Sequence, residues 1–259
     1  MTMETLTDFL TTGIFAFLLV FVRIGTAAMI MPGLGDSFVP SNIRLYIALG
    51  LSLVLSPVIQ PYVPSPIPPL SIMFALIIME FIIGLFVGTI ARVLMVALDT
   101  AGMLISMSSG LANAQVFNPS LAMQGSVVGA FMSVTGVVLI FTTNMHHLLI
   151  YGLVESYVMF PVGGVPDTGS MAEMMARAVS ASFLTGFQIA IPFLVLSLLI
   201  YIGMGVLSRL MPQIQVFILA LPMQIMLSIL TLALTLSAGL LFWLGRFESG
   251  MTIFLTSGG

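Results

Sequence analysis

The sequence contains no cysteine and no lysine, and only 6% of its 259 residues are charged. Without cysteine, the chain can form no disulfide bond and can offer no thiolate to a metal ion. Six arginines and a net charge of −3 leave no basic surface that would bind nucleic acid or an anionic membrane. Soluble domains carry about 25% charged residues, so this composition is far outside the range of a soluble protein.

Apolar residues take the place of the missing charges and make up 59% of the chain. Uncharged stretches run through residues 178–208 and 210–245, and about 20 residues at about 1.5 Å per residue cross the hydrocarbon core of a bilayer. We therefore predict an all-α, polytopic membrane protein that forms one domain over residues 1–259. Its apolar segments are expected at residues 9–31, 45–60, 70–98, 121–142, 183–207 and 214–245, with a shorter interfacial helix or half-span at 148–160.

Prolines predict where the helices are interrupted. Residues 56–71 contain six prolines, which favour a stiff, extended linker and disfavour a helix. A single helix over the uncharged run from Leu210 would be about 54 Å long, against a hydrocarbon core of about 30 Å. We predict that Pro212 and Pro222 break this run and leave residues 223–245 as the span.

Two connections carry further turn signals. Residues 31–44 combine prolines with two glycines and are expected to form a turn-rich connection. Residues 160–174, FPVGGVPDTGSMAEM, are expected to form a loop. Within it, Asp167 and Ser170 have side chains that suit the cap of a helix beginning near Met171.

Residues that carry enzymatic or metal chemistry are few. The only histidines, His146 and His147, are neighbours, and neighbours on a helix point about 100° apart, so they do not chelate one ion together. The sequence has no HExxH motif. Residues 107–110 read Met-Ser-Ser-Gly, which lacks the first glycine of the GxSG turn of a rhomboid-like serine protease. We predict no metal site, no cofactor and no enzymatic activity.

Four ionisable residues fall within apolar segments, where a charge is costly and often functional. Arg92 and Asp99 are seven residues apart and share one face of their predicted helix. One hypothesis is that Arg92, Asp99 and Glu80 form the substrate or proton site of a secondary transporter. The other hypothesis is that these charges, with Arg23, are paired or face a wet interior where helices pack together.

Small residues recur at a spacing that lets two helices approach closely. Gly84 and Gly88 lie on nearly the same stripe as Arg92 and Asp99, in the small-xxx-small pattern GLFVG. A second such pair occurs in the sequence GSVVG. We predict that helix packing or a subunit contact is marked by Gly84, Gly88, Arg92, Asp99, Gly125 and Gly129.

The middle of the chain, SSGLANAQVFNPSLAMQG at residues 108–125, interrupts the apolar pattern. Composition alone favours a polar loop between two spans. However, the chain has no charged residue between Asp99 and Glu155 to hold this loop in water, and Leu111 and Phe117 favour burial. A loop that suits neither lipid nor solvent fits the inside of a pore.

Four separated stretches, in register and spread over essentially the whole chain, resemble the FliR family of flagellar biosynthetic proteins. The opening stretch, residues 22–57, has an apolar helix with an arginine, a Pro/Gly turn and a Pro-x-x-x-Arg entry into a second helix. The other three are GLANAQVFNPS at 110–120, NMHHLLIYGLVESYVMFPVG at 144–163 and SRLMPQIQVFILALPMQI at 208–225. The last carries the family's Arg-x-x-Pro-Gln segment, here Arg209, Pro212 and Gln213, and a second proline, Pro222.

This resemblance implies a role in the export gate of bacterial type III secretion, in the flagellum or in a virulence injectisome. A FliR-like subunit is built from bent helical hairpins and joins FliP-like and FliQ-like proteins in a helical, conical hetero-oligomer. FlhA-like and FlhB-like export proteins are further expected partners, and unfolded polypeptides pass through the centre. The implied location is the inner membrane at the flagellar basal body, with much of the cone raised toward the periplasm.

The family's central loop contributes to a plug that closes the resting pore. We therefore expect a non-enzymatic, pore-forming and structural subunit, with the secondary transporter and the equivalent injectisome subunit as alternatives. Relatives with Asp-Pro in this loop carry a charge that Asn118-Pro119 lacks here. Carried over by position, the plug residues are Gly110, Leu111, Ala112, Asn113, Ala114, Gln115, Val116, Phe117, Asn118 and Pro119.

Overall fold

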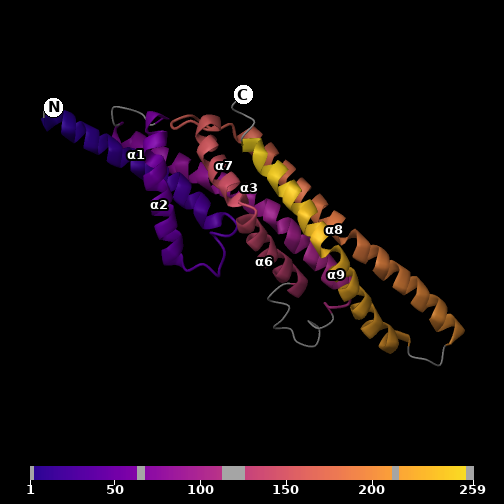
Figure 1. The fold of residues 1–259 in the computed structure, drawn as a ribbon. Coiled ribbons are helices and arrows are strands. Elements are labelled where there is room, and N and C mark those ends of the chain that lie inside the picture. Colours follow the sequence, from indigo (N-terminus) through magenta and orange to yellow (C-terminus); the bar gives the residue numbers. More distant parts are fainter. Residues whose placement is uncertain (1–2, 63–67, 113–125, 212–215, 255–259) are drawn as a thin grey trace. The chain divides into compact units, whose positions relative to one another are not determined.

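Helices form the regular structure of the chain (Figure 1). The computed structural model describes residues 3–62, 68–112, 126–211 and 216–254, and no strand occurs within these ranges. The predicted all-α fold is therefore confirmed. The helices are α1 (Met3–Ile30), α2 (Ser41–Ile59), α3 (Leu70–Ser108), α6 (Val127–Thr142), α7 (Met145–Met159), α8 (Thr168–Leu210) and α9 (Val216–Met251), with 3₁₀ turns η1 (Gln60–Tyr62) and η2 (Thr252–Phe254).

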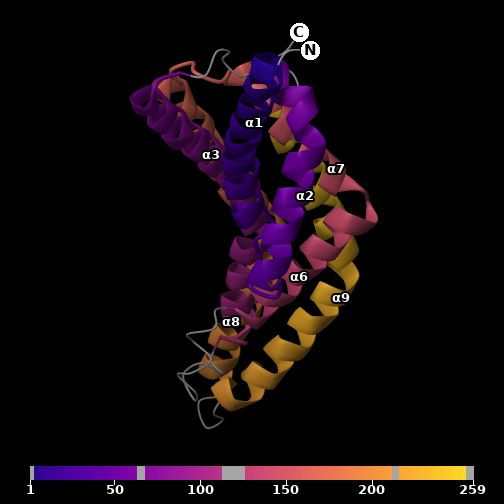
Figure 2. The same ribbon diagram turned by 90° about the vertical axis from the view of Figure 1, so that its left-hand side faces the viewer.

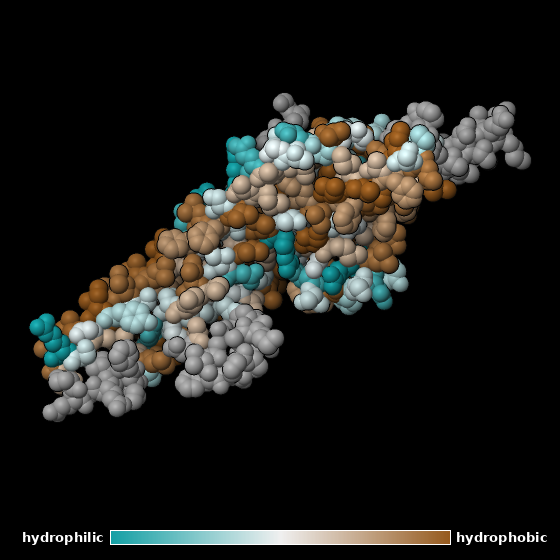
Figure 3. All heavy atoms as spheres, turned by 180° about the vertical axis from the view of Figure 1, so that it is seen from behind, coloured by the Kyte–Doolittle hydropathy of each residue, from teal (hydrophilic) through white to brown (hydrophobic). Residues whose placement is uncertain are grey.

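Five of these helices are long and apolar enough to cross a membrane: α1, α2, α3, α8 and α9. Helices α6 and α7 are bent by 79° across a short break and add a sixth span if the pair counts as one. This agrees with the predicted six apolar segments and the shorter piece at 148–160. Figure 3 shows apolar side chains over much of the visible surface along the helices, as expected for helices that face lipid or apolar protein neighbours.

The chain divides into two compact units, each made of segments distant in sequence. Unit 1 comprises Met1–Val93, Ile140–Ala178 and Glu248–Gly259, and unit 2 comprises Leu94–Leu139 and Val179–Phe247. In unit 1, α1 packs against α2, and Figures 1 and 2 both show the two helices side by side. A cluster of buried side chains joins α1 to the start of α3 and consists of Phe15, Ala16, Leu19 and Leu76.

In unit 2 the second half of α3 is in contact with α6, α8 and α9. A Cβ atom on Gly186 of α8 would lie 2.6 Å from the carbonyl oxygen of Ala97, so only glycine allows this approach. Trp243 of α9 is 1% exposed, and its indole N–H donates to the carbonyl of Leu94 at 3.1 Å. The single tryptophan of the chain therefore reports on the packing of unit 2.

Several predicted interruptions of the helices are wrong. Pro57 lies inside α2 and Pro222 inside α9, so neither the extended linker at residues 56–62 nor the break at Pro222 is observed. A proline removes one backbone hydrogen bond, and membrane helices accept this loss where neighbouring groups satisfy the freed carbonyl. Helix α8 ends at Leu210 and α9 begins at Val216, and the predicted break at Pro212 lies outside the described residues.

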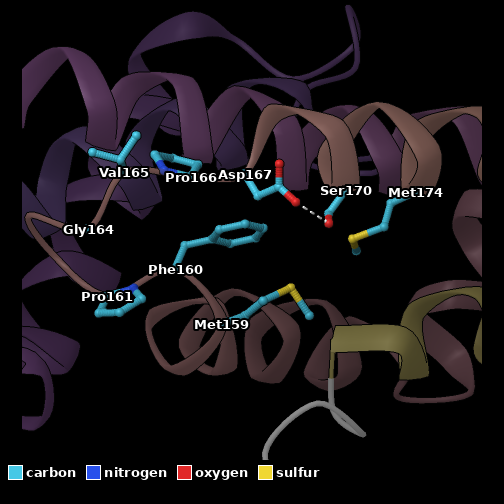
Figure 4. A pocket seen from close by; sticks show the side chains of 9 residues that line it. All are labelled: Met159, Phe160, Pro161, Gly164, Val165, Pro166, Asp167, Ser170 and Met174. Carbon is cyan, nitrogen blue, oxygen red and sulfur yellow. Dashed lines mark hydrogen bonds between the residues drawn. The ribbon is translucent and has the colours of Figure 1, made fainter.

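Two helix boundaries also differ from the prediction. Helix α3 continues ten residues beyond the expected end at residue 98, to Ser108. Helix α8 begins at Thr168, three residues before Met171, with Asp167 as its cap. The Asp167 carboxylate accepts a hydrogen bond from the backbone N–H of Gly169 at 3.0 Å. It also accepts one from the Ser170 hydroxyl at 2.6 Å (Figure 4).

Candidate functional site

A buried ion pair joins three helices of unit 1. Arg23 on α1 is 0% exposed and Glu80 on α3 is 1% exposed. The guanidinium donates two hydrogen bonds to the carboxylate, from Nε at 2.6 Å and from Nη2 at 2.8 Å. It also donates to the carbonyls of Ser156 at 3.0 Å and Phe160 at 2.9 Å, at the end of α7. The Cζ atom of Arg23 lies 3.8 Å from the centre of the Tyr157 ring, over its face.

The donors of Arg23 are all matched by acceptors, because Nη1 also reaches the hydroxyl of Ser156 at 3.3 Å. A buried ion pair is tolerated when both partners are held by further hydrogen bonds. We call Arg23, Glu80, Ser156, Tyr157 and Phe160 the unit 1 charge cluster. Both charges are buried, and their hydrogen bonds connect α1, α3 and the end of α7, which is the geometry of a structural contact.

The other two charges of α3 have different partners. Arg92 pairs with Asp36, which lies in the turn between α1 and α2 and also accepts the backbone N–H of Gly33 at 2.7 Å. Asp99 accepts a hydrogen bond from the hydroxyl of Ser133 on α6. Each ionisable side chain of α3 therefore binds a different segment of the chain.

This arrangement does not assemble the transporter site of the alternative hypothesis. Glu80 and Arg92 are twelve residues apart on the part of α3 in unit 1, or about 18 Å, and Asp99 belongs to unit 2. Each of the three contacts a different segment of the chain. A single substrate or proton would not meet all three at once.

The predicted glycine stripe on α3 lies against the backbone of α1. A Cβ on Gly84 would be 2.4 Å from the carbonyl oxygen of Arg23, and a Cβ on Gly88 would be 2.9 Å from that of Ala27. Because backbone atoms cannot move aside, only glycine permits this separation of the two helices. The same approach brings Arg23 within reach of Glu80.

A second close approach in unit 2 involves a glycine that the sequence analysis missed. Gly102 on α3 faces Gly129 on α6, and a Cβ on Gly102 would lie 2.2 Å from the Gly129 Cα. The predicted pair was Gly125 and Gly129, of which Gly125 lies outside the described residues. Small residues at one spacing along a helix do not identify a contact between two helices, which is why Gly102 was not found.

The two ends of the central loop are joined by hydrogen bonds next to this glycine contact. Ser126, the residue before α6, caps that helix by accepting the N–H of Gly129 at 3.0 Å. Its hydroxyl also donates to the carbonyl of Gly102 at 2.9 Å and lies 2.8 Å from the hydroxyl of Ser106. We call Gly102, Ser106, Ser126 and Gly129 the loop stem, because they hold residues 106 and 126 together at the base of the loop.

Helix α3 ends in a tight turn that leads into the loop. Gly110 has a φ of 78°, a conformation that favours glycine. The N–H of Ala112 then donates a hydrogen bond to the carbonyl of Ser106 at 3.1 Å. The amide of Gln224 on α9 donates to the carbonyl of Ser108 at 2.6 Å, and Gln224 is 5% exposed. Of the predicted plug, Gly110, Leu111 and Ala112 are therefore positioned, and residues 113–119 lie outside the described residues.

The family-motif segment is only partly described. Arg209 lies in the last turn of α8 and is exposed. Pro212 and Gln213 lie outside the described residues, and Pro222 lies inside α9, two residues before Gln224. The sequence analysis made no prediction for Gln224, and its polar side chain within the apolar run of α9 is the signal that could have found it.

The loop between α7 and α8 in unit 1 encloses a pocket of about 330 Å³ (Figure 4). Met159, Phe160 and Met174 give it an apolar lining, and the Asp167 carboxylate at its edge is already bonded to Ser170 and Gly169. Among the described residues no group of three histidine, aspartate or glutamate side chains is placed to hold a metal ion. The pocket therefore presents apolar surface and no group of metal ligands.

Comparison with known proteins places these features in a wider group. The sequence model of a family described as "Bacterial export proteins, family 1" matches residues 14–250. "Flagellar biosynthetic protein FliR" of Caulobacter vibrioides is 38% identical over 237 residues, which cover 91% of this chain and 94% of that protein. The protein of the same name in Bacillus subtilis is 30% identical over 229 residues, 86% of each chain. "Yop proteins translocation protein T" of Yersinia pestis is 28% identical over 186 residues, 70% of each chain.

Proposed function

The chain belongs to the FliR family of bacterial export proteins, as the sequence analysis predicted, and on that premise we propose that it is a subunit of the flagellar type III export gate. In this proposal it is a non-enzymatic, structural and pore-forming subunit in the bacterial inner membrane, at the flagellar basal body. FliP-like and FliQ-like subunits surround it, and FlhA-like and FlhB-like proteins complete the apparatus. Unfolded flagellar polypeptides pass through the assembly, and residues 1–259 act as a single export-gate domain.

The loop at residues 110–119 closes the resting pore. The observation that carries this proposal is the loop stem, in which Ser106 and Ser126 are 2.8 Å apart across the ends of the loop. With its ends fixed, an uncharged loop can be presented at one place in a channel and can yield there to a passing chain. Uncharged side chains suit this task, because a ring of fixed charges would discriminate among exported polypeptides.

Two alternatives receive less support. A secondary transporter needs coupled charges at one site, and Glu80, Arg92 and Asp99 each have a different partner. An injectisome subunit remains the nearest alternative, because the Yersinia translocation protein is 28% identical to this chain. The higher identity of 38% to the Caulobacter flagellar protein favours the flagellar assignment.

A deletion tests the plug. Removing residues 113–119 leaves the loop stem and the turn at Gly110 in place, so we expect the gate to assemble and to leak small solutes. Solute entry into cells that express the gate is the measurement, and recovery of the purified complex checks assembly. Asn118→Asp, which keeps the loop length and supplies the charge of Asp-Pro relatives, is the matched control and should seal. Normal complex recovery with unchanged permeability would show that the loop does not close the pore.

A further inference from the structure

Helix α3 carries three charged residues, and among the described residues two of them meet an opposite charge. Glu80 pairs with Arg23, and Arg92 pairs with Asp36. Asp99 is exposed and forms no ion pair with any arginine in the part of the chain that the structure describes. Its one bond comes from the Ser133 hydroxyl to Oδ1, so Oδ2 accepts no hydrogen bond from the described residues.

The surroundings of Asp99 are apolar. Residues 96, 99, 103 and 107 recur at spacings of three and four and so share one face of α3. The glycine contact at Gly102 and Gly129 holds α6 beside this stripe, and Ser133 of α6 reaches Asp99 there. The large apolar side chains of the stripe are 40–60% exposed: Val96, Met103 and Met107.

We call Val96, Asp99, Met103, Met107 and Ser133 the α3–α6 face, which lies entirely within unit 2. Figures 1 and 2 both show α3 and α6 adjacent along this part of the chain. Water is a poor environment for the three exposed apolar side chains, and a carboxylate that faces lipid hydrocarbon is costly. A protein surface that covers the apolar side chains and brings a cation to Asp99 satisfies both demands.

We propose that the α3–α6 face docks an apolar helix of a partner membrane subunit, and that this helix places one arginine or lysine against Asp99. Ser133 holds Oδ1 and leaves Oδ2 for the cation, so the carboxylate is oriented before the partner arrives. The Arg23–Glu80 pair shows that the chain itself uses this chemistry to join helices in an apolar setting. The proposal rests on the proposed function, since it requires that the chain assembles with other membrane subunits.

Charge reversal is the direct test. Affinity purification of the tagged full-length chain from cells with the complete export apparatus measures how much of each partner subunit is recovered. A like charge against the partner's cation should lower this recovery about tenfold or more for Asp99→Lys, and Asp99→Asn should lower it less. Glu173→Lys is the control, because Glu173 is 64% exposed and pairs only with Arg177 in its own helix. Recovery with Asp99→Lys at the wild-type level would overturn the proposal.

A cross-link keeps the test valid if Asp99→Lys fails to fold. The chain has no cysteine, so Met103→Cys introduces a single thiol on the α3–α6 face for a photo-activated cross-linker. We expect an adduct with the mass of a partner membrane subunit. An adduct with an exported polypeptide, or with lipid alone, would refute the docking of a partner helix. If the wild-type chain recovers no partner subunits at all, the proposed function fails; if it does and both tests are negative, only this inference fails.

Discussion

Replacing Arg23 by methionine should lower the free energy of unfolding by several kilocalories per mole. The variant leaves the Glu80 carboxylate 1% exposed and without its counter-ion. Breaking one side of a buried ion pair costs about 3–5 kcal/mol. The carbonyl of Phe160 also loses the Arg23 donor at 2.9 Å, and an unsatisfied buried acceptor costs about 1–3 kcal/mol.

The double variant Arg23→Met/Glu80→Met sharpens this prediction. It removes both charges together, so the uncompensated carboxylate disappears. The carbonyls of Ser156 and Phe160 both lose the Arg23 donor, and that of Ser156 keeps the backbone N–H of Phe160. We expect the double variant to be more stable than Arg23→Met alone by about 2–4 kcal/mol, because apolar residues of similar volume often replace a buried pair at little cost. Non-additivity of this size is typical of residues in direct contact.

Denaturant unfolding of the purified chain in detergent, followed by far-ultraviolet circular dichroism, measures these differences. Arg177→Met is the matched control, because Arg177 is 71% exposed and its pair with Glu173 is worth about 0.3–0.5 kcal/mol. Fluorescence of Trp243 follows unit 2 separately from unit 1, where the charge cluster lies. A loss below about 1 kcal/mol for Arg23→Met, or strictly additive effects in the double variant, would refute the reasoning.

Two further predictions concern helix packing and helix capping. Gly102→Ala should separate α3 from α6, because the added Cβ would lie 2.2 Å from a backbone atom of Gly129. We expect unit 2 to become less stable, as measured by Trp243 fluorescence. Gly203→Ala is the control and should be neutral or stabilising, because no atom lies within 4 Å of the added Cβ. Equal effects of the two substitutions would contradict the glycine contact. The hydroxyl of Ser170 and the N–H of Gly169 hold the pKa of the Asp167 carboxyl below its ordinary value. The ionised cap therefore stabilises α8 above about pH 4, and this stabilisation is lost as the pH falls further. The difference in unfolding free energy between wild type and Asp167→Ala should shrink in acid. A difference that does not change with pH would show that the carboxylate contributes nothing.

The positions of the helices were largely predictable, and their ends were not. Long apolar runs leave few alternatives to a membrane helix, so α1, α2, α3, α8 and α9 lie where hydropathy expected them. Residues 99–108 mix polar and small side chains, so the hydropathy pattern predicted that the apolar segment of α3 ends at residue 98. The helix continues because Gly102 packs on Gly129 and Gln224 holds the Ser108 carbonyl, and both contacts come from distant parts of the sequence.

The site was predictable as a set of residue types and not as a set of partners. Glu80, Arg92 and Asp99 stand out because charges are rare in apolar helices, but periodicity along one helix says nothing about what lies opposite. Arg23 and Glu80 are 57 residues apart, and Asp36 lies in a turn where an acidic residue attracts no attention. The composition of the central loop suggested the inside of a pore, and the prediction that it is a plug came from the family resemblance.

The central claim is that this chain is one subunit of a multi-protein export gate. The most direct test is native mass measurement of the complex that co-purifies with the tagged chain in mild detergent. The account predicts a single copy of this 27.7 kDa chain together with several copies of smaller membrane proteins. A monomer, or a symmetric oligomer of this chain alone, would contradict it.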